Sequence, residues 1–326
     1  MGFPLTGAAA LLSLLGSSKN LTSSKARLCR KLGINVQHLM LLAHSLNDLE
    51  PLLEIKETTL RLQKKLDLLD AAAIYRDAKG PGRIEVLEFI DSTNTRMLQR
   101  SSNLISGDAL LAEIQTAGRG RRNSRWFSGI AKNVTLSVCW FFDENCHLQG
   151  LSSAAGAAVA AALEQQGFAG IEVKWPNDLF FKNKKLGGIL IETVPHEGQT
   201  MAVTGIGINL LQRGIPDLKK NIVALEECRP GTTPDRNQIC TVLISAIRRA
   251  CAEFASGGLA PFLPELKTRD YLYGKKIALE DEVHHHLEGR ACGIDSGGAL
   301  QLDTGPQIIS VTTGHIELLP ATDTDA

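Results

Sequence analysis

The sequence predicts a soluble α+β protein built from three successive parts. The chain has 326 residues, with 35 Lys and Arg against 35 Asp and Glu, and 44% of its residues are hydrophobic. This composition excludes disordered, collagen-like and membrane-spanning proteins. A helical pattern at the start, alternating strands and helices in the middle, and short strands between glycine-rich turns at the end predict the three parts.

The first part has the pattern of a helix-turn-helix. Residues 8–15 predict an apolar helix that is too short to cross a bilayer. Residues 25–32 predict a second helix that stops at Gly33, and residues 35–47 predict a third. Residues 52–62 partly alternate between apolar and polar, as a small wing hairpin would.

The middle part alternates predicted strands with predicted helices. A turn-rich junction at residues 78–82 separates it from the first part, so the boundary is expected near residue 80. A linking helix is expected before this junction, at 64–75, and the helices of the middle part are expected at 93–100, 153–166, 236–255 and 261–268. Strands are expected at 84–90, 110–115, 133–142, 171–174, 178–181, 186–194 and 201–209.

The last part is predicted to be a small β-barrel, with strands at 275–279, 284–294, 299–302 and 308–311. The run His284-His285-His286 falls on one of these strands, where only alternate side chains share a face. Because no carboxylate stands at an obvious ligand spacing, an exposed strand is a better interpretation of this run than a metal site.

The seven cysteines are odd in number and scattered, and no two have the CxxC spacing. This pattern indicates neither a disulfide framework nor a zinc site. The sequence therefore predicts a protein of the reducing cytoplasm.

An arginine-rich loop is the strongest local signal. Between Gly118 and Phe127, four arginines occur within seven residues of a neutral protein. Glycines let the backbone turn tightly, and guanidinium groups pair bidentately with carboxylate or phosphate. The loop is therefore expected to stay mobile until an anion binds. On this segment alone, a solvated basic loop or an RNA-binding Arg/Gly stretch remains an alternative.

Three further segments carry polar groups or glycines at turns and strands. KWPND at 174–178 is followed by Lys185 at the start of an apolar strand, and DSTN at 91–94 lies between a strand and a helix N-terminus. In GIGIN at 205–209, the paired glycines would let a flat ligand or another backbone approach a buried strand. Alone, the first segment fits an ordinary hairpin and the second a helix cap.

Together these motifs resemble those of the bacterial biotin protein ligases, in the bifunctional form with an N-terminal DNA-binding domain. The resemblance covers almost the whole chain, and DSTN, QxAGRGRRxxxWFS, KWPND with a following KLGGIL, and GIGIN occur in the family's order. It implies a winged helix-turn-helix at 1–65, a linker at 66–82, a mixed-sheet catalytic domain of the biotin/lipoate ligase type at 83–268, and an SH3-like small β-barrel at 269–326.

The resemblance also implies a two-step reaction. Biotin carboxylate attacks the α-phosphate of ATP, which is bound with Mg²⁺, to give biotinyl-5'-adenylate and pyrophosphate. A lysine of the biotin carboxyl carrier protein of acetyl-CoA carboxylase then attacks the adenylate. Both steps concentrate negative charge, so positioned cations are the main requirement. Homodimer formation and repression of biotin synthesis genes through operator DNA are further properties that the family implies.

By the same resemblance, the expected site residues fall into two groups, with Lys185 as the principal catalytic cation and Arg121 as a second catalytic residue. Biotin would be held by Ser92, Thr93, Asn94, Gln115, Arg119, Gly120, Arg121 and Lys185. ATP or the adenylate would contact Gly118, Arg122, Trp126, Lys174, Asn177, Asp178 and Asn209. Asn177 and Asp178 are also the expected neighbours of Mg²⁺.

Two features depart from the family pattern. The arginine motif usually continues with Gly where this chain has Asn123, and Asn tolerates positive φ, so the loop turn is expected to be kept. The expected recognition helix offers Asn35, Gln37 and His38 to bases, yet no Lys or Arg occurs between Lys31 and Lys56. Phosphate contacts supply much of DNA affinity, so this absence weakens the prediction of operator binding.

Two other functions are alternatives to biotin ligation. One is a DNA-binding regulator that senses a small ligand, although such a sensor has no need for cations that stabilise a phosphoryl transition state. The other is a lipoate or octanoyl transferase on a related fold, which is not expected to combine the GRGRR motif with an N-terminal helix-turn-helix.

Overall fold

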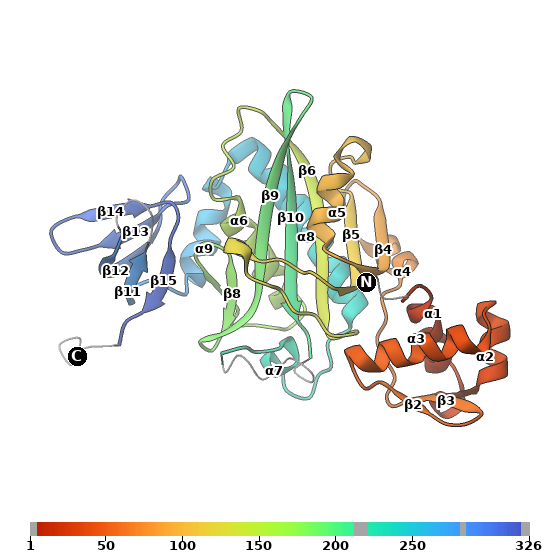
Figure 1. Ribbon diagram of the computed structural model, residues 1–326. Coiled ribbons are helices and arrows are strands. Elements are labelled where there is room, and N and C mark those ends of the chain that lie inside the picture. The colour runs from red at the N-terminus through yellow and green to blue at the C-terminus, as the bar shows by residue number, and fades with distance from the viewer. Residues whose placement is uncertain (1–4, 212–220, 281–284, 321–326) are drawn as a thin grey trace.

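The computed structural model, which describes residues 5–211, 221–280 and 285–320, contains three units, each with its own sheet (Figure 1). These sheets have three, seven and five strands in chain order. The predicted α+β class, with a central mixed sheet and a C-terminal antiparallel sheet, is confirmed.

The N-terminal unit packs three helices on a small sheet. Gly33 adopts the left-handed conformation (φ 66°) in the turn between the second and third helices. Leu11, Leu39 and Leu60 are fully buried together, so the apolar run at 8–15 forms part of a core. The elements are α1 (Ala8–Gly16), α2 (Lys25–Leu32), α3 (Val36–Leu49), β1 (Thr22–Ser24), β2 (Leu53–Ile55) and β3 (Thr59–Leu62).

The helix predicted at 64–75 is wrong in its first half. Helix α4 spans Ala71–Asp77 and begins after Asp70, whose carboxylate accepts hydrogen bonds from the N–H groups of Ala72 and Ala73 (2.9 and 3.0 Å). The residues before it are held out of a helix by tertiary contacts, because Leu68 O accepts a hydrogen bond from Asn237 Nδ2 (2.9 Å).

The central unit is a seven-stranded mixed sheet with helices on both faces. Its strand order is β4-β5-β6-β10-β9-β8-β7, in which β4 and β5 are parallel and the other pairs antiparallel. The strands are β4 (Ile84–Ile90), β5 (Ala109–Gln115), β6 (Asn133–Asp143), β7 (Glu172–Lys174), β8 (Asp178–Phe181), β9 (Lys184–His196) and β10 (Gln199–Asn209).

Alanine-rich α6 (Leu151–Gln165) and the long α8 (Arg236–Gly257) cover one face of this sheet, and the short α5 (Thr93–Gln99) packs on the other (Figure 1). Gly156 of α6 lets the helix approach closely, since a Cβ there would stand 3.1 Å from Val173. The remaining α-helices of the described residues are α7 (Leu225–Cys228) and α9 (Leu263–Arg269).

The C-terminal unit is an antiparallel sheet of order β14-β13-β12-β11-β15. The strand predicted from residue 284 begins only at Leu287, because His285 takes a left-handed conformation (φ 58°), and His284 lies outside the described residues. A fifth strand, β15, was not predicted. The strands are β11 (Lys276–Glu280), β12 (Leu287–Ile294), β13 (Leu300–Asp303), β14 (Ile308–Val311) and β15 (His315–Leu318).

All seven cysteines lie in the described ranges and are free. Across the same ranges, His, Cys, Asp and Glu form no cluster that could hold a metal ion. None of the helices in the described part of the chain has the length and apolar character that a bilayer crossing requires.

Candidate active site

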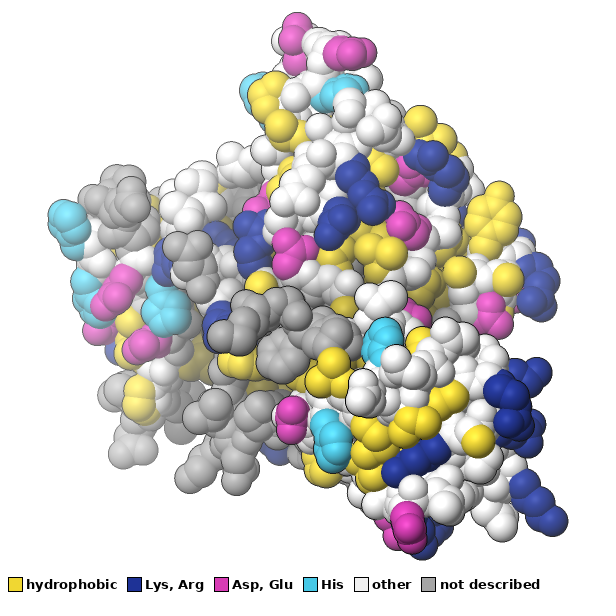
Figure 2. All heavy atoms as spheres, turned by 45° about the vertical axis from the view of Figure 1, so that its right-hand side comes forward, with side chains coloured by type: hydrophobic (Ala, Val, Ile, Leu, Met, Phe, Trp, Pro, Cys, Tyr) yellow, Lys and Arg dark blue, Asp and Glu magenta, His cyan; other side chains and the backbone are white. Residues whose placement is uncertain are grey.

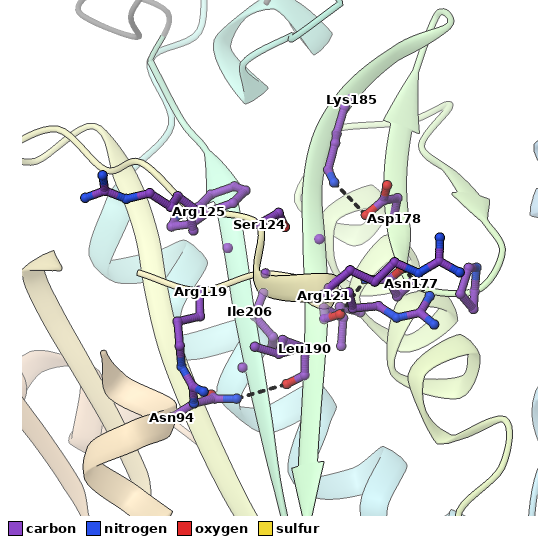
Figure 3. Close-up of a pocket in the computed structure, with 18 of the residues that line it drawn as sticks. Asn94, Arg119, Arg121, Ser124, Arg125, Asn177, Asp178, Lys185, Leu190 and Ile206 are labelled. Atoms are coloured by element: carbon purple, nitrogen blue, oxygen red, sulfur yellow. Dashed lines mark hydrogen bonds and ion pairs between the residues drawn. The ribbon is translucent and has the colours of Figure 1, made fainter. Parts of the chain in front are cut away.

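A cavity of about 500 Å³ lies between the arginine loop (118–128) and the central sheet (Figure 3). Its walls come from segments far apart in sequence: the start of α5, the arginine loop, the KWPND turn, the start of β9 and strand β10. The cavity therefore collects all four sequence motifs. Its lining includes every expected biotin and nucleotide residue except Gly118: Ser92, Thr93, Asn94, Gln115, Arg119, Gly120, Arg121, Arg122, Trp126, Lys174, Asn177, Asp178, Lys185 and Asn209.

One end of the cavity is lined by buried hydroxyl and amide groups. Ser92 caps α5, with its Oγ accepting from Thr95 N (3.4 Å), and Gln115 Oε1 accepts from Thr93 N (2.8 Å). Asn94 Nδ2 donates to Leu190 O (3.2 Å), as Figure 3 shows. These side chains are held before any ligand arrives. The DSTN segment is thus a helix cap that also lines a cavity.

Ser137 on β6 is a member of this polar network that sequence reasoning missed. Its side chain is fully buried, and its Oγ lies 2.6 Å from Asn94 Oδ1 and 2.7 Å from Thr93 Oγ1. No motif surrounds it, because its role depends on pairing across the sheet rather than on its sequence neighbours.

The paired glycines of β10 allow two side chains of the same protein to approach the strand closely. A Cβ at Gly205 would stand 2.3 Å from Asn94 Oδ1, and one at Gly207 would stand 2.6 Å from the Trp126 ring. Asn94 and Trp126 line the cavity, and so do Gly205 and Gly207 themselves.

The other end of the cavity carries cations. Lys185 Nζ lies 2.7 Å from Asp178 Oδ1, and Arg121 Nη1 donates to Asn177 Oδ1 (3.2 Å) (Figure 3). Burial lowers the pKa of Lys174, and the neighbouring Lys185 and Lys275 lower it further, against the opposing effect of Asp178. Such a cluster of positive groups with few carboxylates favours binding of an anion.

The arginine loop stands between two hollows. Gly118 lines the second one, of about 520 Å³, on the other side of the loop. The loop is closed by hydrogen bonds from Gly120 N to Ser124 O and from Trp126 N to Gly118 O (both 2.8 Å). Arg122 in this loop takes a left-handed conformation (φ 50°). Strained backbone of this kind is common in ligand clamps.

The loop is also tied across the cavity. Arg119 Nη2 lies 2.7 Å from Glu192 Oε2, which also accepts from Asn94 Nδ2 (3.0 Å). Burial, followed by the nearby charge of Arg122, lowers the pKa of Arg121.

The C-terminal unit contributes to the cavity through Gly314, His315 and Ile316, which sequence reasoning missed. Lys174 Nζ donates to Ile316 O (3.5 Å), and Trp175 Nε1 donates to Gly298 O (3.0 Å). No local pattern distinguishes these residues, because they reach the cavity only after the third unit packs on the KWPND turn.

The residues expected to read DNA lie outside this cavity, on the N-terminal unit. Asn35 caps α3, with its Oδ1 accepting from His38 N (2.8 Å). Gln37 and His38 are exposed. The structure therefore separates the expected DNA-reading residues from the expected ligand-binding residues.

In this mixed α+β domain, one cavity joins hydroxyl and amide groups to a cluster of cations. Residues 86–209 match the family model described as the biotin/lipoate A/B protein ligase family. The chain belongs to this family.

Relatives cover most of the chain. It is 36% identical over 266 residues to the bifunctional ligase/repressor BirA of Salmonella typhimurium, a match that covers 80% of this chain and 81% of the relative. It is 30% identical over 250 residues to the biotin–[acetyl-CoA-carboxylase] ligase of Mycobacterium tuberculosis, covering 72% and 88%. The solved biotin protein ligase from Aquifex aeolicus in complex with biotin and ATP superposes with a TM-score of 0.63 at 27% identity, covering 73% and 99%.

Proposed function

We propose that this chain is a bifunctional biotin protein ligase, which activates biotin with ATP and transfers it to a lysine of a biotin carboxyl carrier protein. One observation carries the proposal: the four motifs, which span residues 91–209, line a single cavity that joins hydroxyl and amide groups to a cluster of cations. Biotin has a matching shape, with a hydrogen-bonding ring system at one end and a carboxylate at the other.

In the first step, an oxygen of the biotin carboxylate forms a bond to the α-phosphorus while the bond to pyrophosphate breaks. We assign Lys185 to the space between carboxylate and α-phosphate, where its ammonium stabilises the charge shared by both groups. Lys185 is now held by Asp178 at 2.7 Å, so a bound phosphate would compete with that carboxylate. Arg119 and Arg121 would close over the anions from the loop.

In the second step, the deprotonated amine of the carrier lysine attacks the acyl carbon of the adenylate, and AMP leaves with the former carboxylate oxygen. The ring system of biotin would stay at the end lined by Ser92, Thr93, Asn94 and Gln115, which keeps the acyl group beside the cations. No covalent intermediate with the enzyme is needed, because positioning and electrostatic stabilisation account for both steps.

The residues also suit Mg²⁺ brought by ATP. Mg²⁺ prefers one or two protein carboxylates together with substrate phosphates and water. Asp178 supplies a carboxylate and Asn177 an amide oxygen at the cationic end. We propose these two residues as its neighbours, where the ion would neutralise phosphate charge.

The direct test is to incubate the full chain with biotin, ATP, Mg²⁺ and a biotin carboxyl carrier domain. We expect the mass of the carrier to increase by one biotinyl group, attached to a single lysine, and we expect no increase when ATP is omitted. Modification by lipoate or octanoate in place of biotin would favour the transferase alternative. Ligand binding without any carrier product would favour the sensor.

We expect Arg121→Gly to release activated biotin from the cavity. Arg121 spans from the loop to Asn177 Oδ1 at 3.2 Å, and a hydrogen bond from a charged group contributes about 1.5–3 kcal/mol. Its loss should speed escape of the adenylate about tenfold or more, measured as biotin on lysines of added albumin.

Arg125→Gly is the matched control for this release. Arg125 belongs to the same loop but is directed away from Asn177 in Figure 3. It should leave albumin labelling near the wild-type level. Equal labelling by the Arg121 variant and the wild type would refute the role of the loop as a lid.

We also propose the finer division of the chain: a winged helix-turn-helix at 1–65, a linker at 66–82, the catalytic domain at 83–268 and an SH3-like domain at 269–326. The turn at Gly33 between α2 and α3, and the hairpin of β2 and β3, support the first assignment. With the name of the Salmonella relative, they support repression of biotin synthesis genes through operator DNA. Cytoplasmic location and homodimer formation stay predictions.

A further inference from the structure

The charge of the protein is divided unequally between its parts. Residues 1–65 hold nine Lys and Arg against four Asp and Glu, which gives them a net charge of +5, and the remainder of the chain balances this with −5. An excess of positive charge on one small unit favours a polyanionic partner. The absence of Lys and Arg from α3 therefore does not make the N-terminal unit neutral.

Much of this positive charge lies on α2, directly before the turn into α3. Lys25, Arg27, Arg30 and Lys31 all reach solvent, and Leu28 is the buried residue of the helix. None of the four cations forms an ion pair with any residue in the described ranges. They are therefore free to meet phosphates, and the first helix of a helix-turn-helix is the one that crosses the DNA backbone.

The outward face of α3 carries exposed apolar side chains beside polar ones in its first two turns, where His38 is exposed as well. Val36 and Leu41 are each 51% exposed, Met40 is half-buried, and Gln37 is exposed between them. The opposite face, with Leu39, Leu42 and Leu46, is fully buried in the core. In a helix-turn-helix, the N-terminal residues of the second helix are the ones that contact base edges.

Cations flank this face at both ends of α3. Helix α2 joins its N-terminal end through Gly33. At its C-terminal end, Asn47 is hydrogen-bonded to Leu53 (2.7 and 2.8 Å), which anchors the wing hairpin. There Lys56 and Arg61 both lie at ion-pair distance from Glu54 (3.2 and 3.7 Å), so the unpaired cations are those of α2. Figure 2 shows hydrophobic side chains on the N-terminal unit, at lower right, with Lys and Arg beside them. Exposed apolar side chains beside the unpaired cations of α2 complement the major groove, whose borders are phosphates and whose floor carries thymine methyl groups.

We propose that α3 reads operator DNA chiefly through thymine methyl groups, which Val36, Met40 and Leu41 contact, and that α2 supplies the phosphate contacts. Gln37 adds a bidentate pair to the N6 and N7 atoms of adenine. The preferred half-site is therefore rich in A·T pairs and needs no guanine read by arginine. This inference rests on the proposed DNA binding but not on the proposed ligase activity.

The test selects duplexes from a randomised pool with the full chain in the presence of biotin, ATP and Mg²⁺, and then replaces each fixed thymine with deoxyuridine. This replacement removes only the C5 methyl group. Burial of one methyl-sized group corresponds to about fourfold in affinity, so each contacted thymine should show a loss of about that size. In Leu41→Ala, the difference between thymine and uracil should vanish at one position of each half-site.

Leu49→Ala is the matched control, because Leu49 is 44% exposed on the same helix but lies nearer the buried side. It should keep the full thymine preference. Arg27→Ala and Arg30→Ala should weaken binding to the thymine and the uracil duplexes equally. Each should also lower the slope of log affinity against log salt concentration by about one. Three results would each overturn the proposal. The selection could enrich duplexes whose fixed positions are guanines, the affinity could stay the same when thymine is replaced with uracil, or no duplex could be enriched. Biotin transfer to the carrier, measured on the same preparations, reports separately on the ligase.

Discussion

Lys185→Ala is expected to slow formation of biotinyl-adenylate by a hundredfold or more while the fold stays intact. Lys185 is the second residue of strand β9. Its side chain is partly exposed, and Asp178 is the one charged group of the described residues at ion-pair distance from it. Removing one positioned donor from a site where negative charge develops raises the barrier by about 2.7–4 kcal/mol. The rate is measured as pyrophosphate release in a single turnover without carrier, which isolates the first step.

Lys184→Ala provides the matched control for Lys185→Ala. Lys184 is the preceding residue, is exposed and does not line the cavity. It removes the same charge from the same hairpin, so a general loss of positive potential would affect both variants alike. A normal first step in Lys185→Ala, or an equal loss in both variants, would contradict the assignment of Lys185 as the principal cation.

The candidate site could be predicted almost completely from sequence because its residues sit in short motifs that combine turn formers with charged groups. DSTN, the arginine loop and KWPND each place their polar side chains at a strand or helix end, where local chemistry is visible in sequence. Ser137 and His315 lack such surroundings. They reach the site through sheet pairing and through packing of the third unit, which one-dimensional patterns do not record.

The errors in the fold prediction have the same origin. Residues 64–70 have helical composition, yet contacts to α8 and β5 hold them in another conformation. Tertiary contacts override local propensity in this segment.

We expect Arg236→Met to lower the free energy of unfolding of the central unit by about 3–5 kcal/mol. Arg236 is 1% exposed, and its Nη1 lies 2.5 Å from Oε2 of Glu113, which is itself 5% exposed. Removing one partner of a buried ion pair leaves the other charge uncompensated, at a cost of about that size. Urea unfolding followed by tryptophan fluorescence measures the loss, because Trp126, Trp140 and Trp175 are the three tryptophans and all lie in the central unit.

A second substitution separates the cost of an unpaired buried carboxylate from the cost of losing the hydrogen bonds of Arg236. In Arg236→Met/Glu113→Gln, no buried carboxylate is left alone, so more than half of the stability should return. The stability that does not return measures the hydrogen bonds from Arg236 to Asn133 O (2.9 Å) and to Asp67 O (3.2 Å). Through Arg236, these bonds connect the segment around Asp67 to strand β6. Arg249→Met, at an exposed position of the same helix, should change stability by less than about 0.5 kcal/mol. If the double variant is as unstable as Arg236→Met, the contacts to Asp67 and Asn133, rather than the charge of Glu113, determine stability at this junction.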